Sequence, residues 1–537
     1  MFKRLTAVLL ALCFVCLTVA GCADSGTPDE TKATEAPEIV TSLSKPDKSA
    51  WKYRADEDFY YQTGIGYCEK PADEKYEQLA IFVPGAYMSA KDNGDGTYTC
   101  EPDQSAVING YTAQEAPIVM PIETGGYAAA PALPDSVVNE YASLTEQIGE
   151  YTTNGFICVF PGCRGIAEGA PTGVADLKAA IRYLRYCDDV IAGDAESIFV
   201  FGMSGGGAQA AILGAAGDSE LYDPYLEAIG AVRGASDAVA GVMAWCPITD
   251  LGTANAEYEW MMGCTRTGRS AQDQAISDGL ATAFAEYVNR AGFVDKDGNT
   301  LTLTRSDEGI YQSGTYYDYI KSEIERSLNN YLSDKCSSAD AAITAKEYVD
   351  TLNADKKWVL YDDKTKTASI TGIADFCRAR KRASDSLVAF DPPHSGNTLF
   401  GFGDGKGTHF DSILAGVLTE LNSEYAAEYQ EDLKKTDSFG YSIGQRLNMY
   451  SPLYYLLESE DGCGTSAVAK FWRIRTGIEQ PNTSVTTEID LALALEQYDG
   501  LQIVDFETVW GLDHTYAERT GNSSTNFIAW VSDCMKK

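Results

Sequence analysis

One short segment, an apolar strand that runs straight into a serine flanked by glycines, constrains the fold more than any other part of the chain. Residues Ser197–Phe201 form the predicted strand, and Gly202-Met203-Ser204-Gly205-Gly206 follows it directly. The pattern G-x-S-x-G is typical of a strand that turns into a helix so sharply that the positions two before and two after the serine must lack bulky side chains. The sequence therefore predicts a strand, a tight turn and a helix, with the Ser204 hydroxyl raised at the end of a sheet.

The same five-residue pattern occurs again at Gly440-Tyr441-Ser442-Ile443-Gly444. This copy follows Lys434-Lys435-Thr436-Asp437-Ser438, which is too polar to form a buried strand. The structural context thus favours Ser204 as a nucleophile, and Ser442 is expected in a loop.

From residue 51 onward the chain alternates predicted strands with helical segments. The predicted strands are Ala116–Ile122, Gly155–Pro161, Ser197–Phe201, Val239–Cys246, Val468–Arg475 and Leu501–Trp510. Apolar residues at helical spacing in 174–184 predict a crossover helix, and right-handed crossovers make the flanking strands parallel. The predicted fold class is α/β, with a mostly parallel, doubly wound sheet that a helix at Thr525–Cys534 closes. An early β-hairpin is expected from Gln78–Val83 and the turn Asp92–Gly96.

Residues 251–465 break this alternation with helical segments that are rich in Ala, Tyr and charged residues. We expect them to form a lid or cap domain inserted between two strands of the sheet. The sheet domain then comprises residues 51–250 and 466–537.

The first 22 residues have the pattern of a secretory signal. Lys3 and Arg4 precede the apolar run Leu5–Val19, and Ala20-Gly21-Cys22 follows. The run is short for a membrane span, and small residues before a cysteine resemble the lipobox of bacterial lipoproteins, in which that cysteine is acylated. The resemblance implies a lipid anchor on Cys22 at the outer face of the cell envelope, with an ordinary cleaved signal as the alternative. Residues 23–50 are polar and are expected to be a flexible tether.

The chain carries 42 Lys and Arg against 78 Asp and Glu, a net charge of −36. So negative a protein repels phosphate backbones, which excludes nucleic acid as a partner, and membrane contact is expected only through the N-terminal anchor. Eleven of the fourteen cysteines lie beyond the signal and Cys22, an odd number that implies no disulfide framework. No Cys or His spacing is typical of zinc, so we expect neither a metal nor a cofactor.

The chain has three histidines, His394, His409 and His514. His514 comes just after the last predicted strand, where the chain order nucleophile, acid, base places the histidine of such a site. The other two fall in the inserted region and are expected as loop or capping residues, although either could line a substrate pocket.

The acid should follow the predicted strand Val468–Arg475. Glu479 is the only carboxylate in the loop 475–483. It is the predicted acid, because a carboxylate there fixes the imidazole tautomer and stabilises the imidazolium. Asp250, at the end of the preceding strand, is the alternative, whereas Asn482 could orient the ring but could not offset its charge.

An oxyanion hole needs two backbone N–H groups. The predicted donors are Gly205, directly after the nucleophile, and Gly126, in the glycine pair that follows the strand at 116–122. Pro84-Gly85 is the competing pair and is more typical of a simple turn.

Three further segments, taken with the serine turn, are similar to bacterial (subtype B) tannases and feruloyl-esterase-like α/β-hydrolases. They are Gly173–Arg185, Trp245–Asp250 and Glu257–Trp260. The resemblance covers most of the chain after the tether. It implies an α/β-hydrolase fold with a large inserted lid, no metal in the chemical step, and ester substrates with phenolic acyl groups such as gallate. It also implies Ser204 as nucleophile, His514 as base, and the acid in the loop that holds Glu479.

The chain departs from the family pattern at three places. Related tannases carry aspartates where Gln480 and Asn482 stand here, and a carboxylate where Ser395-Gly396 stands. Fungal relatives join cysteines at the positions of Met203 and Thr515. The expected function is a serine carboxylesterase that forms an acyl-enzyme on small-molecule or polysaccharide-linked esters. The alternatives are a binding lipoprotein that has lost catalysis and an acyltransferase on the same fold.

Overall fold

The computed structural model describes residues 38–537 except 307–308, 339 and 382–394. Cys22, the predicted signal and most of the predicted tether lie outside the described residues. Residues 39–537 form one compact unit. Within the described ranges, no helix is both long enough and apolar enough to cross a membrane.

The end of the predicted tether packs on the folded unit. Val40 exchanges backbone hydrogen bonds of 3.0 and 3.2 Å with Arg233, and the Tyr183 hydroxyl donates to the Ser44 carbonyl at 2.8 Å. The boundary expected at residue 50 therefore lies earlier. The reason is that distant segments supply hydrogen-bond partners which the composition of this segment does not reveal.

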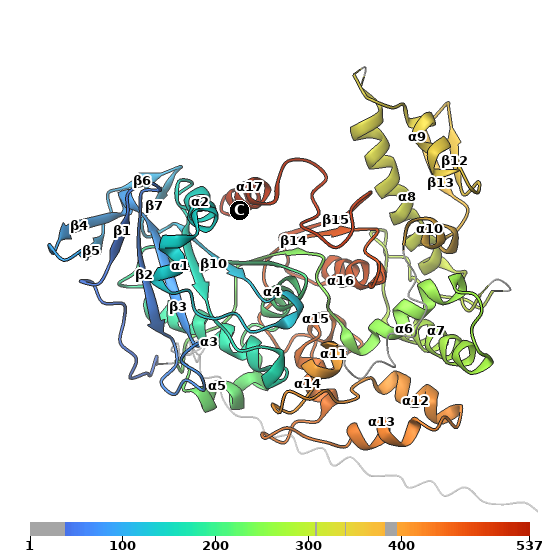
Figure 1. The fold of residues 1–537 in the computed structure, drawn as a ribbon, viewed down its shortest axis with the longest axis horizontal. Coiled ribbons are helices and arrows are strands. Elements are labelled where there is room, and N and C mark those ends of the chain that lie inside the picture. The colour runs from blue at the N-terminus through green and yellow to red at the C-terminus, as the bar shows by residue number, and fades with distance from the viewer. Residues whose placement is uncertain (1–37, 307–308, 339, 382–394) are drawn as a thin grey trace, which may run out of the picture. The chain divides into compact units, whose positions relative to one another are not determined.

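A nine-stranded mixed sheet forms the centre of the unit, in the order β1-β2-β3-β9-β8-β10-β11-β14-β15 (Figure 1). Its strands are β1 (Lys52–Arg54), β2 (Phe59–Gly66), β3 (Gln78–Pro84), β8 (Pro117–Ile122), β9 (Ile157–Pro161), β10 (Asp194–Met203), β11 (Gly241–Trp245), β14 (Phe471–Gly477) and β15 (Ile503–Val509). The ladders from β9 to β15 are parallel, whereas β1, β2 and β3 pair antiparallel. The predicted α/β class with a mostly parallel sheet is confirmed.

Helices cover both faces of this sheet, and β10 shows the consequence. The helices are α2 (Ala142–Thr152), α3 (Thr172–Tyr186), α4 (Gly205–Ala215), α16 (Thr486–Gln497) and α17 (Ser523–Cys534), with the shorter α1 (Asp135–Glu140) and α5 (Asp223–Ile229). Ile198 and Val200 pack in the cluster that contains α3, α4 and α16, whereas Phe199 and Phe201 pack on the other face with α2 and α17. Successive side chains of a strand point to opposite faces, so a strand covered on both faces is continuously apolar.

The early hairpin differs from its prediction. The turn after Asp92 joins β4 (Met88–Asp92) to β5 (Tyr98–Pro102), and these two strands form a separate antiparallel pair. The run predicted at Gln78–Val83 is β3, which lies in the main sheet between β2 and β9. Residues 79–84 are all buried, as an interior strand requires and an isolated hairpin does not.

The chain between β11 and β14 is mostly helical, as expected for an inserted region. Its elements are α6 (Leu251–Met262), α7 (Ala271–Ala291), α8 (Thr315–Cys336), α9 (Ala345–Leu352), β12 (Val359–Asp362), β13 (Thr367–Ile370), α10 (Ile373–Arg380), α11 (Ser395–Leu399), α12 (Ser412–Glu420), α13 (Ala426–Asp432), α14 (Ile443–Met449) and α15 (Pro452–Leu456). Helices α6 and α7 pack on each other and on α12, whereas α15 packs on α4 and α16 beside the sheet. The last part of the predicted insertion 251–465 thus joins the packing of the sheet domain, and a lid role for the rest stays a prediction.

Candidate active site

Ser204 stands between the end of β10 and the first residue of α4, with φ 60° and ψ −123°. Residues with side chains rarely adopt a positive φ, and a turn from strand to helix of this sharpness requires it. A Cβ on Gly202 would lie 2.6 Å from the carbonyl carbon of Gly206, and a Cβ on Gly206 would lie 2.1 Å from the carbonyl oxygen of Ile122. Backbone packing therefore requires both glycines of the motif.

The imidazole of His514 lies beside this serine. Its Nε2 is 2.7 Å from Ser204 Oγ. Because β10, β14 and β15 run in the same direction, the loops that follow them emerge at one edge of the sheet, where sites in open α/β folds are built. The structure thus brings together two of the predicted residues, which are 310 positions apart in the sequence.

The charge state of His514 suits a proton acceptor. Burial lowers the pKa of His514 below its ordinary value, and the Asp513 carboxylate opposes this lowering in part. The ring is therefore neutral at neutral pH, and a neutral Nε2 within hydrogen-bond distance of a hydroxyl can accept its proton.

The other ring nitrogen faces an amide. His514 Nδ1 lies 2.9 Å from Gln480 Oε1, and Gln480, on the loop after β14, is only 1% exposed. Its Nε2 lies 2.5 Å from Glu488 Oε1 and 3.1 Å from Thr476 Oγ1. The resemblance to tannases, which implied an acid in this loop, is the signal that points to the segment around Gln480. No feature of the sequence points to Glu488, because the path of the loop after β14 decides whether its carboxylate contacts Gln480.

Glu479, the predicted acid, is not brought to the ring. Its carboxylate forms a two-pronged pair with Arg380 of α10, with both N–O distances 2.8 Å, and accepts the Gly511 N–H at 3.2 Å. The residue that meets His514 is its neighbour Gln480, because adjacent loop residues project to different sides. Arg380 lies 99 positions away in the inserted region, and no sequence pattern places it beside this loop.

Asp250, the alternative acid, has partners other than His514. Asp250 precedes α6 with φ 54°, and its carboxylate accepts a hydrogen bond from the Ser451 hydroxyl. Burial raises the pKa of Asp250 to about 7. Asn482 is exposed. Among the described residues, neither Asp250 nor Asn482 forms a hydrogen bond with His514.

The loop after β8 packs directly against the serine turn. Gly126 has φ 61° within the tight turn Gly125–Tyr127, and a Cβ on Gly205 would lie 3.1 Å from Gly126 N. Gly126 and Gly205 are at the starts of helical turns, where N–H groups have no acceptor inside the helix. The two N–H groups predicted as oxyanion donors are therefore neighbours.

Two other backbone N–H groups already have acceptors. Tyr127 N–H donates to the Thr124 carbonyl at 2.8 Å, and Gly85 N–H, the competing candidate, donates to the Asp58 carbonyl at 2.7 Å. The Thr124 hydroxyl also donates to Gln209 Oε1 at 2.7 Å, which ties the loop to α4.

Two other candidates from the sequence have structural partners. His409 Nδ1 lies 2.7 Å from Asp432 Oδ2, and its ring stacks on Tyr429 with the centres 4.1 Å apart. Ser442, expected in a loop, is the N-cap of α14 and accepts the Gln445 N–H at 3.2 Å. His394 lies outside the described residues.

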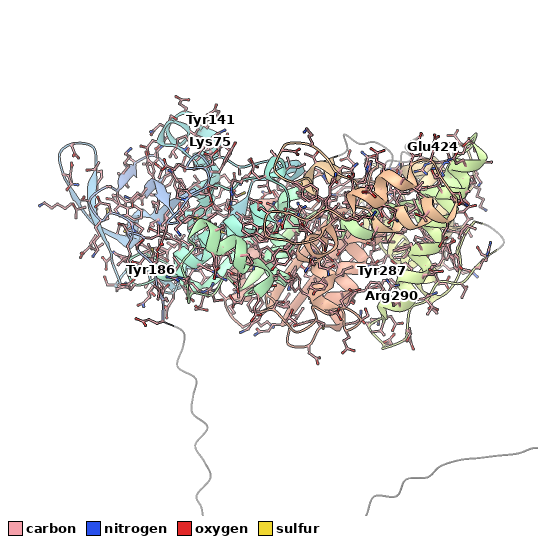
Figure 2. The ribbon with its side chains drawn as sticks, turned by 90° about the horizontal axis from the view of Figure 1, so that it is seen from below. Lys75, Tyr141, Tyr186, Tyr287, Arg290 and Glu424 are labelled. Atoms are coloured by element: carbon pink, nitrogen blue, oxygen red, sulfur yellow. The ribbon has the colours of Figure 1, made fainter. Side chains whose placement is uncertain are left out.

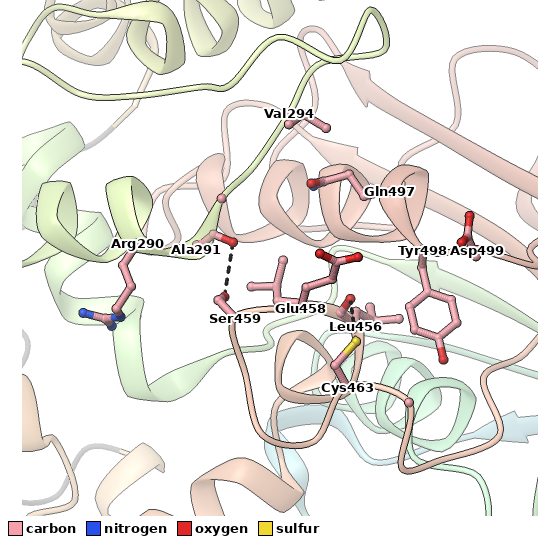
Figure 3. Close-up of a pocket in the computed structure, with 13 residues that line it drawn as sticks. Arg290, Ala291, Val294, Leu456, Glu458, Ser459, Cys463, Gln497, Tyr498 and Asp499 are labelled. Atoms are coloured by element: carbon pink, nitrogen blue, oxygen red, sulfur yellow. Dashed lines mark hydrogen bonds between the residues drawn. The ribbon is translucent and has the colours of Figure 1, made fainter. Parts of the chain in front are cut away.

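A cavity of about 790 Å³ opens at the end of α7. On this helix the Arg290 guanidinium lies 5.8 Å from the centre of the Tyr287 ring (Figure 2). Inside the cavity the Ser459 hydroxyl donates to the Ala291 carbonyl at 3.2 Å (Figure 3). The residues that line it do not include Ser204 or His514.

A second cavity, of about 380 Å³, lies beside the loop that leads to His514. Its lining includes Trp510, Gly511, Leu512 and Arg380. Throughout the part of the chain that the structure describes, no three His, Cys, Asp or Glu side chains come together in a way that could hold a metal ion.

The chain is similar to the family model BD-FAE over residues 107–309, a range that contains Gly126 and Ser204. The comparison with curated proteins found no match.

Solved structures of bacterial tannases are similar over nearly the whole chain. The tannin acyl hydrolase of Lactobacillus plantarum has a TM-score of 0.70 and 24% identity, and the match covers 92% of this chain and 98% of that one. For the Fusobacterium nucleatum tannase the TM-score is 0.69 with 26% identity, covering 92% and 99%. A tannin acyl hydrolase in complex with ethyl gallate has a TM-score of 0.68 and 25% identity, covering 93% and 96%. The resemblance to tannases and feruloyl-esterase-like α/β-hydrolases is confirmed, and it supports an ester-hydrolysing enzyme.

Proposed function

We propose that this protein is a serine carboxylesterase that works through an acyl-enzyme. The observation that carries the proposal is the 2.7 Å distance between Ser204 Oγ and His514 Nε2 at a strand-to-helix turn. A hydroxyl held against a neutral imidazole is an activated nucleophile. A Cβ on Gly205 would lie 3.1 Å from Gly126 N, and this closeness supports the two N–H groups as donors to the negative charge that develops in acyl transfer.

The chemistry follows from this arrangement. His514 Nε2 takes the Ser204 proton while Oγ attacks the ester carbonyl carbon. The carbonyl oxygen becomes negative, and the Gly205 and Gly126 N–H groups stabilise it. When the tetrahedral intermediate collapses, His514 gives the proton to the departing alcohol, and the acyl group stays on Oγ. Water, activated by the same imidazole, then releases the acid and restores the serine.

For substrates we favour esters with phenolic acyl groups of the galloyl or feruloyl type. Two of the similar structures are tannin acyl hydrolases, one of them bound to ethyl gallate, and each matches more than nine-tenths of this chain. The signal-like N-terminus supports attachment through a lipid on Cys22 at the outer face of the cell envelope.

The test is a panel of methyl gallate, methyl ferulate, 4-nitrophenyl acetate and acetylated xylan, assayed with the wild type and with Ser204→Ala. The variant should lower kcat by roughly 10³-fold or more, because only the oxyanion donors and substrate binding remain. A fluorophosphonate probe should label the wild type and not the variant. Hydrolysis by Ser204→Ala at the wild-type rate would contradict the proposal.

A hydrolase-fold protein that binds a ligand without catalysis is the second candidate, and one observation favours it. His514 Nδ1 faces the Gln480 amide, and an amide offsets less imidazolium charge than a carboxylate does. If the wild type hydrolyses no ester of the panel but binds methyl gallate in a calorimetric titration, this second function is the correct one.

A further inference from the structure

Behind the amide that faces His514 lies a buried carboxylate. Glu488, in the first turn of α16, has no exposed surface, and its Oε1 lies 2.5 Å from Gln480 Nε2. We infer that Glu488 is a positioning residue of the proposed esterase: it fixes the orientation of the Gln480 amide and supplies, through that amide, the negative charge that the ring does not contact directly. The inference rests on the serine mechanism proposed above.

The hydrogen-bond donors of Gln480 show how its amide is oriented. Nε2 carries two N–H groups, and two acceptors receive them, Glu488 Oε1 at 2.5 Å and Thr476 Oγ1 at 3.1 Å. Oε1 is then left to face His514 Nδ1 at 2.9 Å. The ring therefore keeps its proton on Nδ1 and presents an unprotonated Nε2 to Ser204.

Glu488 excludes the opposite orientation of the amide. The two ends of an amide are nearly equal in size, so a turned Gln480 would fit the same space and donate to Nδ1. The ring proton would then sit on Nε2, the tautomer that cannot accept the Ser204 proton. An ionised carboxylate accepts hydrogen bonds and cannot donate them, so it binds only the NH₂ end.

Thr476, Lys381 and Cys246 also face Glu488. Thr476 Oγ1 donates to Glu488 Oε1 at 3.0 Å. Lys381, itself buried, donates to the backbone carbonyl of Gln480 at 2.5 Å. Burial raises the pKa of the Cys246 thiol, and the negative charge of Glu488 adds to this rise. Burial raises the pKa of Glu488 to about 7, while the Gln480 and Thr476 hydrogen bonds and the charge of Lys381 act in the opposite direction. The carboxylate is therefore ionised above neutral pH.

No proton leaves Nδ1 during the proposed reaction. The Ser204 proton moves to Nε2, the ring becomes a cation, and its hydrogen bond to Gln480 strengthens because Glu488 polarises the amide. Glu488 keeps its negative charge throughout. The imidazolium cation, the Gln480 amide dipole and the Glu488 anion therefore lie in that order along one line of hydrogen bonds.

The test uses full-length protein and the best ester of the panel. Glu488→Gln keeps the shape of the side chain and removes its charge. Glu496→Gln makes the same change at an exposed position of α16 and is the matched control. The double variant Gln480→Glu/Glu488→Gln exchanges amide and carboxylate at nearly constant volume.

Glu488→Gln should lower kcat by roughly 10- to 100-fold. Enzymes lose activity in this range when a group that orients a metal-binding histidine is removed, and Glu488 orients His514 in a comparable way through Gln480. KM should not change, because Glu488 has no exposed surface with which to contact an ester, and Glu496→Gln should behave like the wild type. The double variant should regain most of the lost kcat, because its carboxylate contacts Nδ1 directly. If Glu488 has only a structural role, the kcat of the folded Glu488→Gln variant should equal that of the wild type.

The pH profile gives a second readout. In the wild type, kcat should fall as the pH drops through about 7, because Glu488 becomes protonated. In Glu488→Gln this fall in kcat near pH 7 should disappear. Only the fall in kcat that follows protonation of His514, at lower pH, should remain.

Equal kcat values and equal pH profiles for the wild type, Glu488→Gln and Glu496→Gln would overturn the inference, provided that Ser204→Ala is inactive. Full activity of Ser204→Ala, or an inactive wild type, would instead refute the esterase itself. If circular dichroism shows that Glu488→Gln does not fold, a measurement on the wild type alone tests the inference. The low-field NMR signal of its His514 Nδ1–H should then shift in a step near pH 7, and the absence of that step overturns the inference.

Discussion

At the scale of single residues, the ring of His514 is held between two neutral groups, the Ser204 hydroxyl and the Gln480 amide. Glu479, one position before the amide, binds Arg380 and the Gly511 N–H instead. Glu479 therefore holds the loop that leads to the histidine, whereas Gln480 holds the histidine.

Substitutions at these two neighbouring positions should separate the roles. Gln480→Leu removes the acceptor for Nδ1 and should lower kcat by roughly 10²- to 10⁴-fold, because the ring is no longer held in one tautomer. Glu479→Gln keeps an acceptor for the Gly511 N–H and weakens only a partly exposed ion pair, so its kcat should fall by less than about tenfold. Steady-state kinetics on one ester measures both effects. A larger loss for Glu479→Gln than for Gln480→Leu would show that Glu479 is the group that acts on the ring.

At the scale of elements, two copies of one pentapeptide have two different roles. Ser204 follows a buried strand and has φ 60°, whereas Ser442 follows a polar segment, has φ −67° and ψ 162°, and caps α14. The glycines of the motif permit the sharp turn, but only the strand before Ser204 imposes it.

Ser442→Ala should lower the free energy of unfolding by about 0.5–2 kcal/mol, because it removes the side-chain acceptor of an N-cap. Its kcat should equal that of the wild type, and Ser442→Thr should keep most of the stability, since threonine also caps helices. Urea denaturation and ester hydrolysis measure the two quantities. Loss of hydrolysis in a folded Ser442→Ala protein would transfer the nucleophile role to the second motif.

The elements that could be predicted are those whose signal is local. The strands β8, β9 and β11 are continuously apolar because helices cover both faces of the sheet, and the serine turn is marked by the apolar end of β10 and by the glycines that permit the turn. The contact to Nδ1 could not be predicted in the same way. Positions 479 and 480 differ by one step along the loop, and Arg380 of α10 and Glu488 of α16 decide which of them turns toward the ring.

At the scale of the whole molecule, part of the negative charge is carried by groups inside the fold. Asp250, Glu257, Glu488 and Asp490 are each at most 5% exposed, and burial raises the pKa of every one of them. A carboxyl group whose pKa is higher in the folded state binds its proton more tightly there. The stability it contributes is complete below the unfolded pKa and is lost as the pH rises through the folded pKa.

Asp250→Asn tests this dependence of stability on pH at one buried carboxyl group. The stability of the variant relative to the wild type should increase from about pH 5 to about pH 8, because only the wild type must ionise a buried carboxyl group with a pKa of about 7. The increase should be on the order of 1–4 kcal/mol. Urea denaturation across this pH range measures it, and a difference that does not vary with pH would contradict the raised pKa.

Cys22→Ser in the full-length protein tests the expected anchor. The variant should lose metabolic labelling by palmitate and move from the membrane fraction to the soluble fraction, because a cysteine thiol is required for acylation. Labelling at the wild-type level would contradict the lipobox interpretation.

The hydroxyl and the imidazole of the proposed site come from positions 310 residues apart, with every helix of the inserted region between them. A growing polypeptide can thus have no hydrolytic competence until its final strand has left the ribosome and docked.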